Sequence, residues 1–378
     1  MTRRMGKSGG RQGQRTIGYA VVGLGHIAQV AVLPAFQHAR ESARLAALVS
    51  GDAKKLRELS ERYGVPAYRY EDLDECLARD DVDAVYIATP NTEHVEPCLQ
   101  AARAGVHVLT EKPMATSEED CREMITACQD ADVKLMVAYR LHFEPANLAA
   151  VSIATSRRIG DPRYFTSTFS YQVEPGNIRT QARLGGGAVW DLGVYCINAA
   201  RYLFRDEPVE VMATAAHPRD RRFKGIEAGW SALLRFPGDR LASFTCAFDC
   251  APTGSYRLVG SEGELRLDPA YEYVGALELT LTVHERSSRK KFPQVDQFAA
   301  ELAYFARCIL DDRQPEPDGH EGLADVRVIE AILRSAREAR PVGIEPVRKT
   351  RRPSPAQTQR RPPVRKPPQV VDAQAPSQ

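Results

Sequence analysis

The feature that most restricts the fold of this chain is a Gly-x-Gly-x-x-Ala pattern between an apolar run and the start of a helix. Gly23-Leu24-Gly25-His26-Ile27-Ala28 directly follows the apolar run 17–22. In a strand–turn–helix unit, the first glycine permits a tight turn, the second lets the backbone approach a pyrophosphate, and the alanine lets the helix pack closely. Amide groups at the start of that helix can bind phosphate. The segment therefore predicts a dinucleotide site, with His26 as a solvated loop residue rather than a catalyst.

Apolar runs and amphipathic stretches alternate as far as residue 143. The runs at 17–22, 45–49, 82–88, 106–109 and 135–138 are typical of buried parallel strands, and stretches of helical length separate them. This alternation predicts an α/β, doubly wound Rossmann domain over 16–143. From 144 to 346, strand-like runs are divided by turn signals, which predicts an α+β domain with a large, open, mainly antiparallel sheet.

Composition and charge exclude several classes of protein. The net charge of +2 combines basic termini with an acidic body, and an acidic body is a poor general binder of nucleic acid. The eight cysteines have neither C-x-x-C spacing nor a zinc pattern, so we predict free thiols and no metal site. No apolar run is long enough to span a membrane, and residues 6–14 lack the apolar core of an export signal. We therefore expect a cytoplasmic protein.

Both termini differ in composition from the body. Residues 1–15 are basic and polar, and residues 347–378 are rich in Pro, Arg and Gln. Such segments cannot bury enough apolar surface to offset the entropy of ordering. We predict that both are disordered, and a weak contact of the tail with an acidic surface or nucleic acid is the alternative.

The residues after the second apolar run bear on which dinucleotide is bound. An acidic residue at this strand end hydrogen-bonds the free ribose 2′-hydroxyl of NAD. Here Ser50-Gly51-Asp52 and then Lys54-Lys55 follow the run. A neutral Ser50, with a lysine able to reach a 2′-phosphate, favours NADP. In the alternative interpretation, Asp52 caps the next helix and both lysines are solvated.

Two further strand ends carry polar residues. Ligands of open α/β sheets bind at the carboxyl ends of the strands. Glu111-Lys112-Pro113 follows the run 106–109, so its lysine is well placed to act on a substrate, with a plain surface lysine as the alternative. Thr89-Pro90-Asn91 follows the run 82–88, and His94 comes one turn later. This loop can line the nicotinamide ribose, or it is an ordinary capping turn.

A glycine run precedes the last candidate group. Gly185-Gly186-Gly187 leads to Asp191 and Tyr195, where a helix should begin. Residues four apart share a face of a helix, so the carboxylate and the phenol are expected side by side. They can form a pair at the site, or they can serve as a helix N-terminal acid and a domain-interface tyrosine.

These motifs occur in the order found in one known family. The fingerprint, Thr89-Pro90-Asn91-x-x-His94, Glu111-Lys112-Pro113 and Asp191-x-Gly-x-Tyr195 together resemble the Gfo/Idh/MocA oxidoreductases over about residues 17–343. The chain is most similar to glucose–fructose oxidoreductase and related NADP-dependent aldose dehydrogenases. Many members of the family have His where this chain has Tyr195, so the tyrosine points to the branch that oxidises pyranoses.

The resemblance implies NADP as cofactor, a sugar substrate, and a homodimer or homotetramer formed through the open sheet. It assigns catalysis to Lys112 and Tyr195, with Asp191 in support. Together with the motifs, it places cofactor contacts at Gly23, Leu24, Gly25, His26, Ile27, Ala28, Ser50, Gly51, Lys55, Thr89, Pro90, Asn91, His94, Glu111, Lys112, Arg140 and Arg179.

The expected reaction is oxidation of a cyclic aldose at C1 to the 1,5-lactone. Tyr195 would accept the proton of the C1 hydroxyl, and Lys112, as an ammonium, would stabilise the phenolate. His142 is a reserve base that we expect to pack at the domain junction instead. A phosphorylated sugar also stays open, because four arginines could bind it: Arg140, Arg179, Arg183 and Arg201.

Two alternatives to an ordinary dehydrogenase remain at this point. The first is an enzyme of the glucose–fructose oxidoreductase type, which retains NADP through two half-reactions. The second is a non-catalytic regulator that senses a dinucleotide, against which the presence of both Lys112 and Tyr195 argues.

Overall fold

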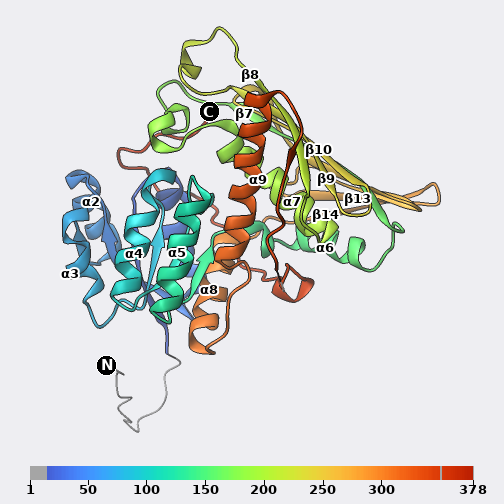
Figure 1. The fold of residues 1–378 in the computed structure, drawn as a ribbon. Coiled ribbons are helices and arrows are strands. Elements are labelled where there is room, and N and C mark those ends of the chain that lie inside the picture. Colours follow the sequence, from blue (N-terminus) through green and yellow to red (C-terminus); the bar gives the residue numbers. More distant parts are fainter. Residues whose placement is uncertain (1–14, 350, 378) are drawn as a thin grey trace.

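The computed structural model describes residues 15–349 and 351–377, which form two adjoining domains (Figure 1). The first domain contains a six-stranded sheet in the order β3-β2-β1-β4-β5-β6, and all its neighbouring strands are parallel. Its strands are β1 (Ile17–Val22), β2 (Ala43–Val49), β3 (Ala67–Tyr68), β4 (Ala84–Ile87), β5 (His107–Thr110) and β6 (Leu135–Val137).

Helices cover both faces of this sheet, which is why its strands are apolar throughout. All six residues of β1 are buried. One face packs against α1 (Leu33–Ala39), α2 (Ala53–Tyr63) and α8 (Gln297–Leu310). The other face packs against α3 (Leu73–Leu77), α4 (Val95–Arg103), α5 (Glu118–Asp130) and α9 (Gly319–Glu338). The predicted Rossmann fold class is confirmed.

The second domain is built on a nine-stranded sheet in the order β14-β13-β12-β11-β7-β10-β9-β8-β15. Its neighbours are antiparallel except for β7 and β10, which are parallel. The strands are β7 (Pro162–Gln172), β8 (Glu210–Ala216), β9 (Gly229–Phe236), β10 (Arg240–Ala247), β11 (Asp249–Gly260), β12 (Gly263–Leu267), β13 (Leu277–Val283), β14 (Arg286–Phe292) and β15 (Val342–Gly343).

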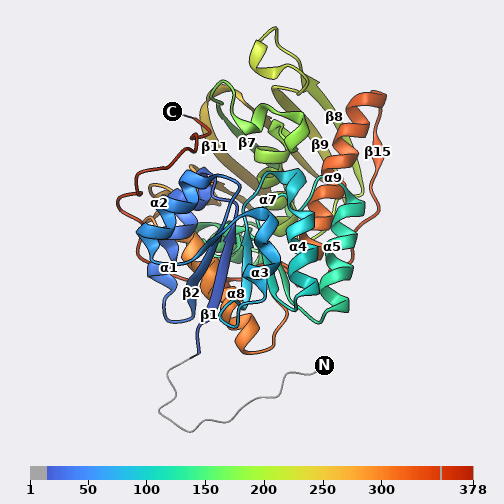
Figure 2. The same ribbon diagram turned by 90° about the vertical axis from the view of Figure 1, so that its left-hand side faces the viewer.

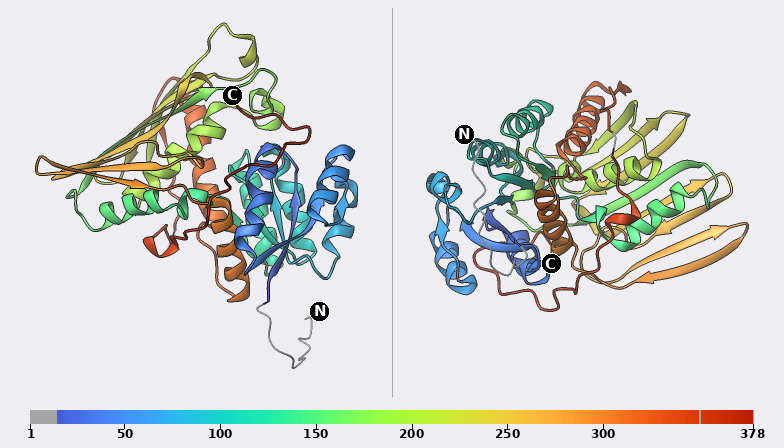
Figure 3. Two further views of the ribbon diagram at one scale, coloured as in Figure 1. Left: turned by 180° about the vertical axis from the view of Figure 1, so that it is seen from behind. Right: turned by 90° about the horizontal axis from the view of Figure 1, so that it is seen from below.

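One face of the large sheet is packed and the other is open (Figures 1 and 3). Helices α6 (Pro145–Thr155), α7 (Val194–Phe204) and α9 lie on the packed face, and a single apolar cluster continues from there to the parallel sheet. No helix within the described ranges covers the other face. The predicted open, mainly antiparallel sheet is therefore confirmed, including the hairpin turn at Pro237-Gly238-Asp239 between β9 and β10. Strand β14 was not predicted, because six of its seven residues are Arg, Lys or Ser and it lies at the sheet edge.

The C-terminal tail differs from its predicted disorder. Residues 351–377 lie along the body, from the second domain past α1 and α2 (Figure 2). Arg352 pairs with Glu207 at 2.8 Å, and Val371 is only 4% exposed. The reason is that an acidic body offers partners to a basic tail, so side-chain and backbone polar contacts replace an apolar core of its own. The predicted disorder of the N-terminus falls outside the described residues, apart from Arg15, which pairs with Asp83.

Candidate active site

The loops after β4 and β5 lie next to each other at the carboxyl edge of the parallel sheet. The ring nitrogens of His94 face the carbonyl oxygens of Thr89 and Pro113, each at 3.0 Å. His94 is fully buried, so it joins the two loops and has no exposed surface for a cofactor. This burial does not agree with the direct cofactor contact that was predicted for His94. Asn91 Nδ2 donates to the carbonyl oxygen of Gly185 at 2.8 Å, which ties the first of these loops, Thr89-Pro90-Asn91, to the glycine run.

Lys112 extends from the end of β5 towards the second domain. Its Nζ donates to the carbonyl oxygen of Asp191 at 3.0 Å and to Asp191 Oδ1 at 3.3 Å. The same Nζ lies 4.7 Å from the centre of the Tyr195 ring. Burial disfavours the ammonium, but Tyr195, Asp191 and Glu111 outweigh it and raise the pKa of Lys112. The alternative of a plain surface lysine does not agree with these contacts.

Asp191 is the centre of the group of charges. Its Oδ2 accepts from Tyr171 Oη at 2.7 Å and from Arg179 Nε at 3.0 Å, in addition to the bond from Lys112. Burial disfavours the carboxylate, yet Arg179, Lys112 and the Tyr171 hydroxyl hold the pKa of Asp191 well below its usual range. Asp191 is therefore ionised and positions its three partners.

Tyr195 lies between two cations. Arg140 Nε donates to the phenol oxygen at 3.2 Å, and the guanidinium carbon is 5.0 Å from the ring centre. Lys112 was expected to favour the phenolate from a few ångströms away, and its ammonium does lie near the ring, although its hydrogen bonds go to Asp191. Arg140, which was not expected to bind the phenol, is the residue that contacts the oxygen. Arg140 is only 6% exposed and is held by Gln297 and the carbonyl of Tyr271. We call Lys112, Arg140, Arg179, Asp191 and Tyr195 the active-site cluster.

Glu111 lies behind this cluster rather than in it. Its carboxylate accepts from Tyr86 Oη at 2.7 Å and from the backbone amide of Lys112 at 3.3 Å. Burial raises the pKa of Glu111. Its contacts therefore orient the loop that carries Lys112.

The glycine loop has the shape that a dinucleotide needs. Gly23 has a φ of +94°, and a Cβ there would lie 2.6 Å from the backbone of Ala88. A Cβ on Gly25 would meet nothing within 4 Å, so open space lies in front of that backbone. Leu24 and Ala28 are buried beneath the loop, and Ile27 packs on the same apolar cluster. The residues present thus fit a pyrophosphate at the start of the helix.

Arg179 reaches towards this loop as well as towards Asp191. Burial and the nearby charge of Arg179 lower the pKa of His26, which keeps that ring neutral. The backbone of residue 186 packs against that of Arg179. A glycine is required at 186, because a Cβ there would lie 2.4 Å from the Arg179 carbonyl oxygen. The loop of Arg179 therefore lies between the fingerprint and the active-site cluster.

The end of β2 provides no acidic side chain to a ribose. Asp52 caps α2 and accepts hydrogen bonds from the amides of Lys54 and Lys55. The alternative in which Asp52 caps the next helix is therefore the one observed. Lys54 is not simply solvated, because its Nζ pairs with Asp372 at 3.0 Å. Lys55 lies 3.9 Å from Asp52, and Gly51 lies under the ring of Tyr70. Ser50 is 4% exposed and sits where an acid would bind a 2′-hydroxyl.

Comparison with known proteins identifies the family. The model of the oxidoreductase family with an NAD-binding Rossmann fold matches residues 17–139, and the GFO/IDH/MocA C-terminal domain matches residues 148–266. The chain belongs to the Gfo/Idh/MocA oxidoreductase family. The predicted resemblance is confirmed.

Three members of the family show its range. The D-xylose 1-dehydrogenase (NADP⁺) 2 of Haloferax volcanii is 33% identical over 84% of this chain and 97% of the relative. The dTDP-3,4-didehydro-2,6-dideoxy-α-D-glucose 3-reductase of Actinomadura kijaniata is 30% identical over 84% of this chain and 95% of the relative. The aldose–aldose oxidoreductase of Caulobacter crescentus, solved with glycerol, is 39% identical with a TM-score of 0.84, covering 87% of this chain and all of that one.

In this Gfo/Idh/MocA protein, a second group of charges lies farther along α7. Arg201 is fully buried and binds Glu207, Glu321 and Asp325 at 2.6 Å each. Asn198 joins it to His142, whose Nε2 is 2.8 Å from the Asn198 amide oxygen. We call this set the buried cluster: His142, Asn198, Arg201, Glu207, Glu321 and Asp325. Arg201 is thus excluded as a ligand of a sugar phosphate, and His142 packs at the domain junction as expected.

Sequence reasoning missed several residues around Tyr195. Phe169 and Tyr171 come from alternate positions of β7, and the period of the predicted strand could have indicated that they share a face. Gln297 and Tyr271 approach Arg140 from segments distant in the sequence, and no local pattern signals them.

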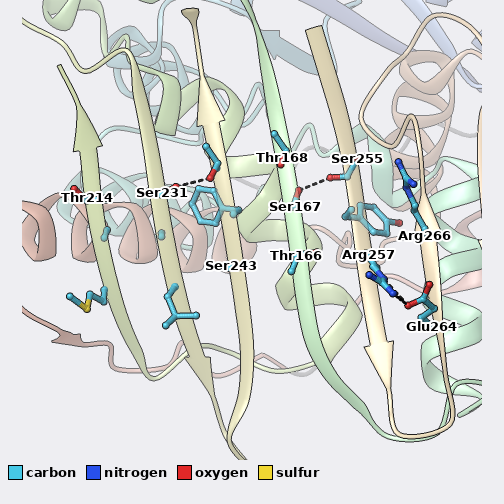
Figure 4. Close-up of a pocket in the computed structure, with 17 residues that line it drawn as sticks. Thr166, Ser167, Thr168, Thr214, Ser231, Ser243, Ser255, Arg257, Glu264 and Arg266 are labelled. Carbon is cyan, nitrogen blue, oxygen red and sulfur yellow. Dashed lines mark hydrogen bonds and ion pairs between the residues drawn. The ribbon is translucent and has the colours of Figure 1, made fainter. Parts of the chain in front are cut away.

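The open face of the large sheet carries a shallow hollow that is separate from this cluster (Figure 4). Small hydroxyl side chains line it together with an Arg–Glu pair, Arg257 and Glu264. None of the predicted site residues is among its lining. Within the part of the chain that the structure describes, no group of His, Cys, Asp or Glu is placed to hold a metal ion. Over the same ranges, no helix has the length and apolar character needed to cross a membrane.

Proposed function

We propose that this protein is an NADP-dependent sugar oxidoreductase that oxidises a cyclic aldose at C1 to the 1,5-lactone. The observation that carries the proposal is the convergence of Lys112, from the end of β5, with Asp191 and Tyr195, from the helical stretch of the second domain, beside the dinucleotide loop. The relatives support the substrate class, because a D-xylose 1-dehydrogenase and an aldose–aldose oxidoreductase are both similar over most of the chain.

The residues of the cluster perform the proton transfer. Tyr195 accepts the proton of the C1 hydroxyl, and its phenolate is stabilised by Arg140 at the oxygen and by Lys112 at the ring face. A charge a few ångströms away in a partly desolvated site is worth several kcal/mol, roughly 4 at an effective dielectric constant of 20. Asp191 holds Lys112 and Arg179 in place and keeps both cationic. NADP, when bound, supplies the acceptor for the hydride from C1.

The cofactor proposal rests on the end of β2. Ser50 replaces the acid that NAD enzymes use there, and Lys54 and Lys55 begin the next helix. Two structures of the Actinomadura kijaniata 3-ketoreductase contain NADP with TDP-benzene, at 28% identity to this chain. The ratio of the binding constants for NADP and NAD tests this point, and a preference for NAD would contradict it.

The reaction is tested by incubating the protein and NADP with a panel of aldoses while following the absorbance of NADPH. We expect reduction of NADP by at least one aldose and formation of the corresponding lactone. No absorbance change with any sugar or polyol, despite tight binding of NADP, would favour the dinucleotide-sensing regulator instead. The similarity to an aldose–aldose oxidoreductase also favours a second candidate, in which the NADPH formed reduces a second sugar.

The same proposal extends to assembly and location. Met212 and Leu233 are exposed on the open sheet face, by 54% and 45%, and a second copy of the chain would bury them. We propose a homodimer or homotetramer, which the mass of the undenatured protein tests. Because all eight cysteines are free, we propose a reducing, cytoplasmic location, which fractionation of cells tests.

A further inference from the structure

The C-terminal segment contacts the dinucleotide loop through one buried glutamine. Gln29 lies one residue after the fingerprint and is fully buried. Its side chain accepts from the amide of Val371 and donates to the carbonyl of Val371, both at 2.8 Å, and it also donates to the carbonyl of Leu24 at 2.9 Å. Val371 packs in the same apolar cluster as Leu24 and Ala28. The segment is therefore attached to the loop that fits the pyrophosphate.

The next residue reaches the end of the site where the 2′-phosphate is proposed to bind. Asp372 pairs with Lys54 at 3.0 Å, and both side chains are half-exposed. An ion pair this exposed adds little stability, and its importance is that it joins the segment to Lys54, next to Lys55 in the first turn of α2. The guanidinium of Arg62 donates from Nη1 to the carbonyl of Gln369 at 2.8 Å, which holds the segment on α2.

The last residues of the segment bind the second domain, just after β7. The amide of Glu174 donates to the carbonyl of Pro376 at 2.9 Å, and Asn177 Nδ2 donates to the carbonyl of Ala375 at 3.0 Å. Asn177 is buried, and its side-chain oxygen accepts from the amide of Arg179. Arg179 in turn binds Asp191. The segment thus supports the loop that connects the fingerprint to the active-site cluster.

We infer that residues 371–376 are part of the cofactor site and slow the release of bound NADP. Five residue steps reach at most about 17 Å, so the segment makes a short link between Gln29 of the first domain, bound at Val371, and Glu174 of the second domain, bound at Pro376. Figure 2 shows the segment running past α2 to the loop of the second domain. On this inference, release of the cofactor requires these contacts to break. The inference rests on the NADP binding proposed above.

The rate of cofactor release tests this inference without any sugar. The full chain is loaded with NADPH, excess NADP is added, and the fall in bound-NADPH fluorescence is followed. A chain that ends at Gln369 and the variant Val371→Asp should each release NADPH at least tenfold faster than the full chain. Asp372→Asn should have a smaller effect of about threefold, because it removes one exposed ion pair only. Lys366→Ala, an exposed change in the same tail, is the matched control and should leave the rate unchanged.

The outcomes separate this inference from the proposed function. Release at the rate of the full chain in both the shortened chain and Val371→Asp would overturn the role of the segment, while NADP binding would stand. If circular dichroism shows that these two variants are unfolded, Asp372→Asn decides, and an unchanged rate there overturns the inference. Failure of the full chain to bind NADPH at all would overturn both proposals.

Discussion

Two groups of charged side chains lie along the same stretch of chain. They differ in how many of their hydrogen-bond donors and acceptors are already paired within the protein. In the active-site cluster, Asp191 lies in the helical turn just before α7 and Tyr195 in the first turn of α7, and the Asp191 side chain is 18% exposed. In the buried cluster, Arg201 lies six residues after Tyr195 and is wholly enclosed by carboxylates. One helix therefore carries both a site and a structural core.

The difference shows which charges are available to a ligand. Every direction around the Arg201 guanidinium is occupied by Glu207, Glu321 or Asp325, so substitution there should affect folding. The phenol oxygen of Tyr195 accepts one hydrogen bond, from Arg140, and the side chain is only partly buried. Substitution of Tyr195 should therefore affect the rate of the reaction rather than folding. Each of the following changes tests one side of this contrast.

Removal of Arg201 should have the largest effect. Arg201→Met removes the buried cation that Glu207, Glu321 and Asp325 share, which costs about 3–5 kcal/mol of unfolding free energy. Urea unfolding measures the loss. Arg183→Met, at an exposed arginine, is the control and should change stability by less than about 0.5 kcal/mol. Equal stabilities of the two variants would remove the distinction between the clusters.

The active-site cluster should respond in turnover instead. Tyr195→Phe and Lys112→Met should each lower kcat at least about a hundredfold, because the proton acceptor or the charge that stabilises it is lost. Steady-state rates with an aldose, together with NADP binding, measure this. Binding of NADP should be largely kept, and Tyr164→Phe, at a tyrosine exposed by 55%, should behave as the unsubstituted protein. Near-normal turnover in either active-site variant would contradict the assignment.

Asp191 should make the stability of the protein depend on acid pH. Because its pKa is held below the ordinary value of about 4, its ionised form stabilises the fold above that pH, and this contribution is lost as the pH falls. Between about pH 5 and pH 2, the free energy of unfolding of the unsubstituted protein should fall by roughly 2 kcal/mol more than that of Asp191→Asn. Urea unfolding across that range measures the difference. If the unfolding free energies of the two proteins changed in parallel with pH, the pKa of Asp191 would not be lowered as described.

The smallest effect is expected at Tyr171. Tyr171→Phe removes one of the hydrogen bonds to Asp191 and leaves those from Lys112 and Arg179. The loss of a single bond, about 1 kcal/mol, predicts a three- to tenfold decrease in kcat/KM. Tyr202→Phe, which removes a buried bond to Asn147 away from the cluster, should change stability alone. A larger kinetic effect at Tyr202 would contradict the separation.

The sequence was sufficient where a property is local. Gly23, Gly25 and Ala28 require a particular backbone shape, and five apolar runs of strand length predicted the parallel sheet. The caps at Asp52 and Ser117 also follow from residues next to the helices that they begin. Such features depend on neighbours in the chain, so a pattern can indicate them.

Tertiary structure alone decided which polar residues share a site. Lys112 binds Asp191, the phenol oxygen receives Arg140, and Arg201 is enclosed in a core, although all of these charges look alike in the sequence. The tail was predicted to be disordered from composition, yet the acidic body and Gln29 hold it. The physical reason is that burial and pairing are set here by segments that lie between 55 and 342 residues apart in the sequence. The sequence by itself determined the backbone of the dinucleotide site, whereas the packing of the two domains determined the partner of each charge.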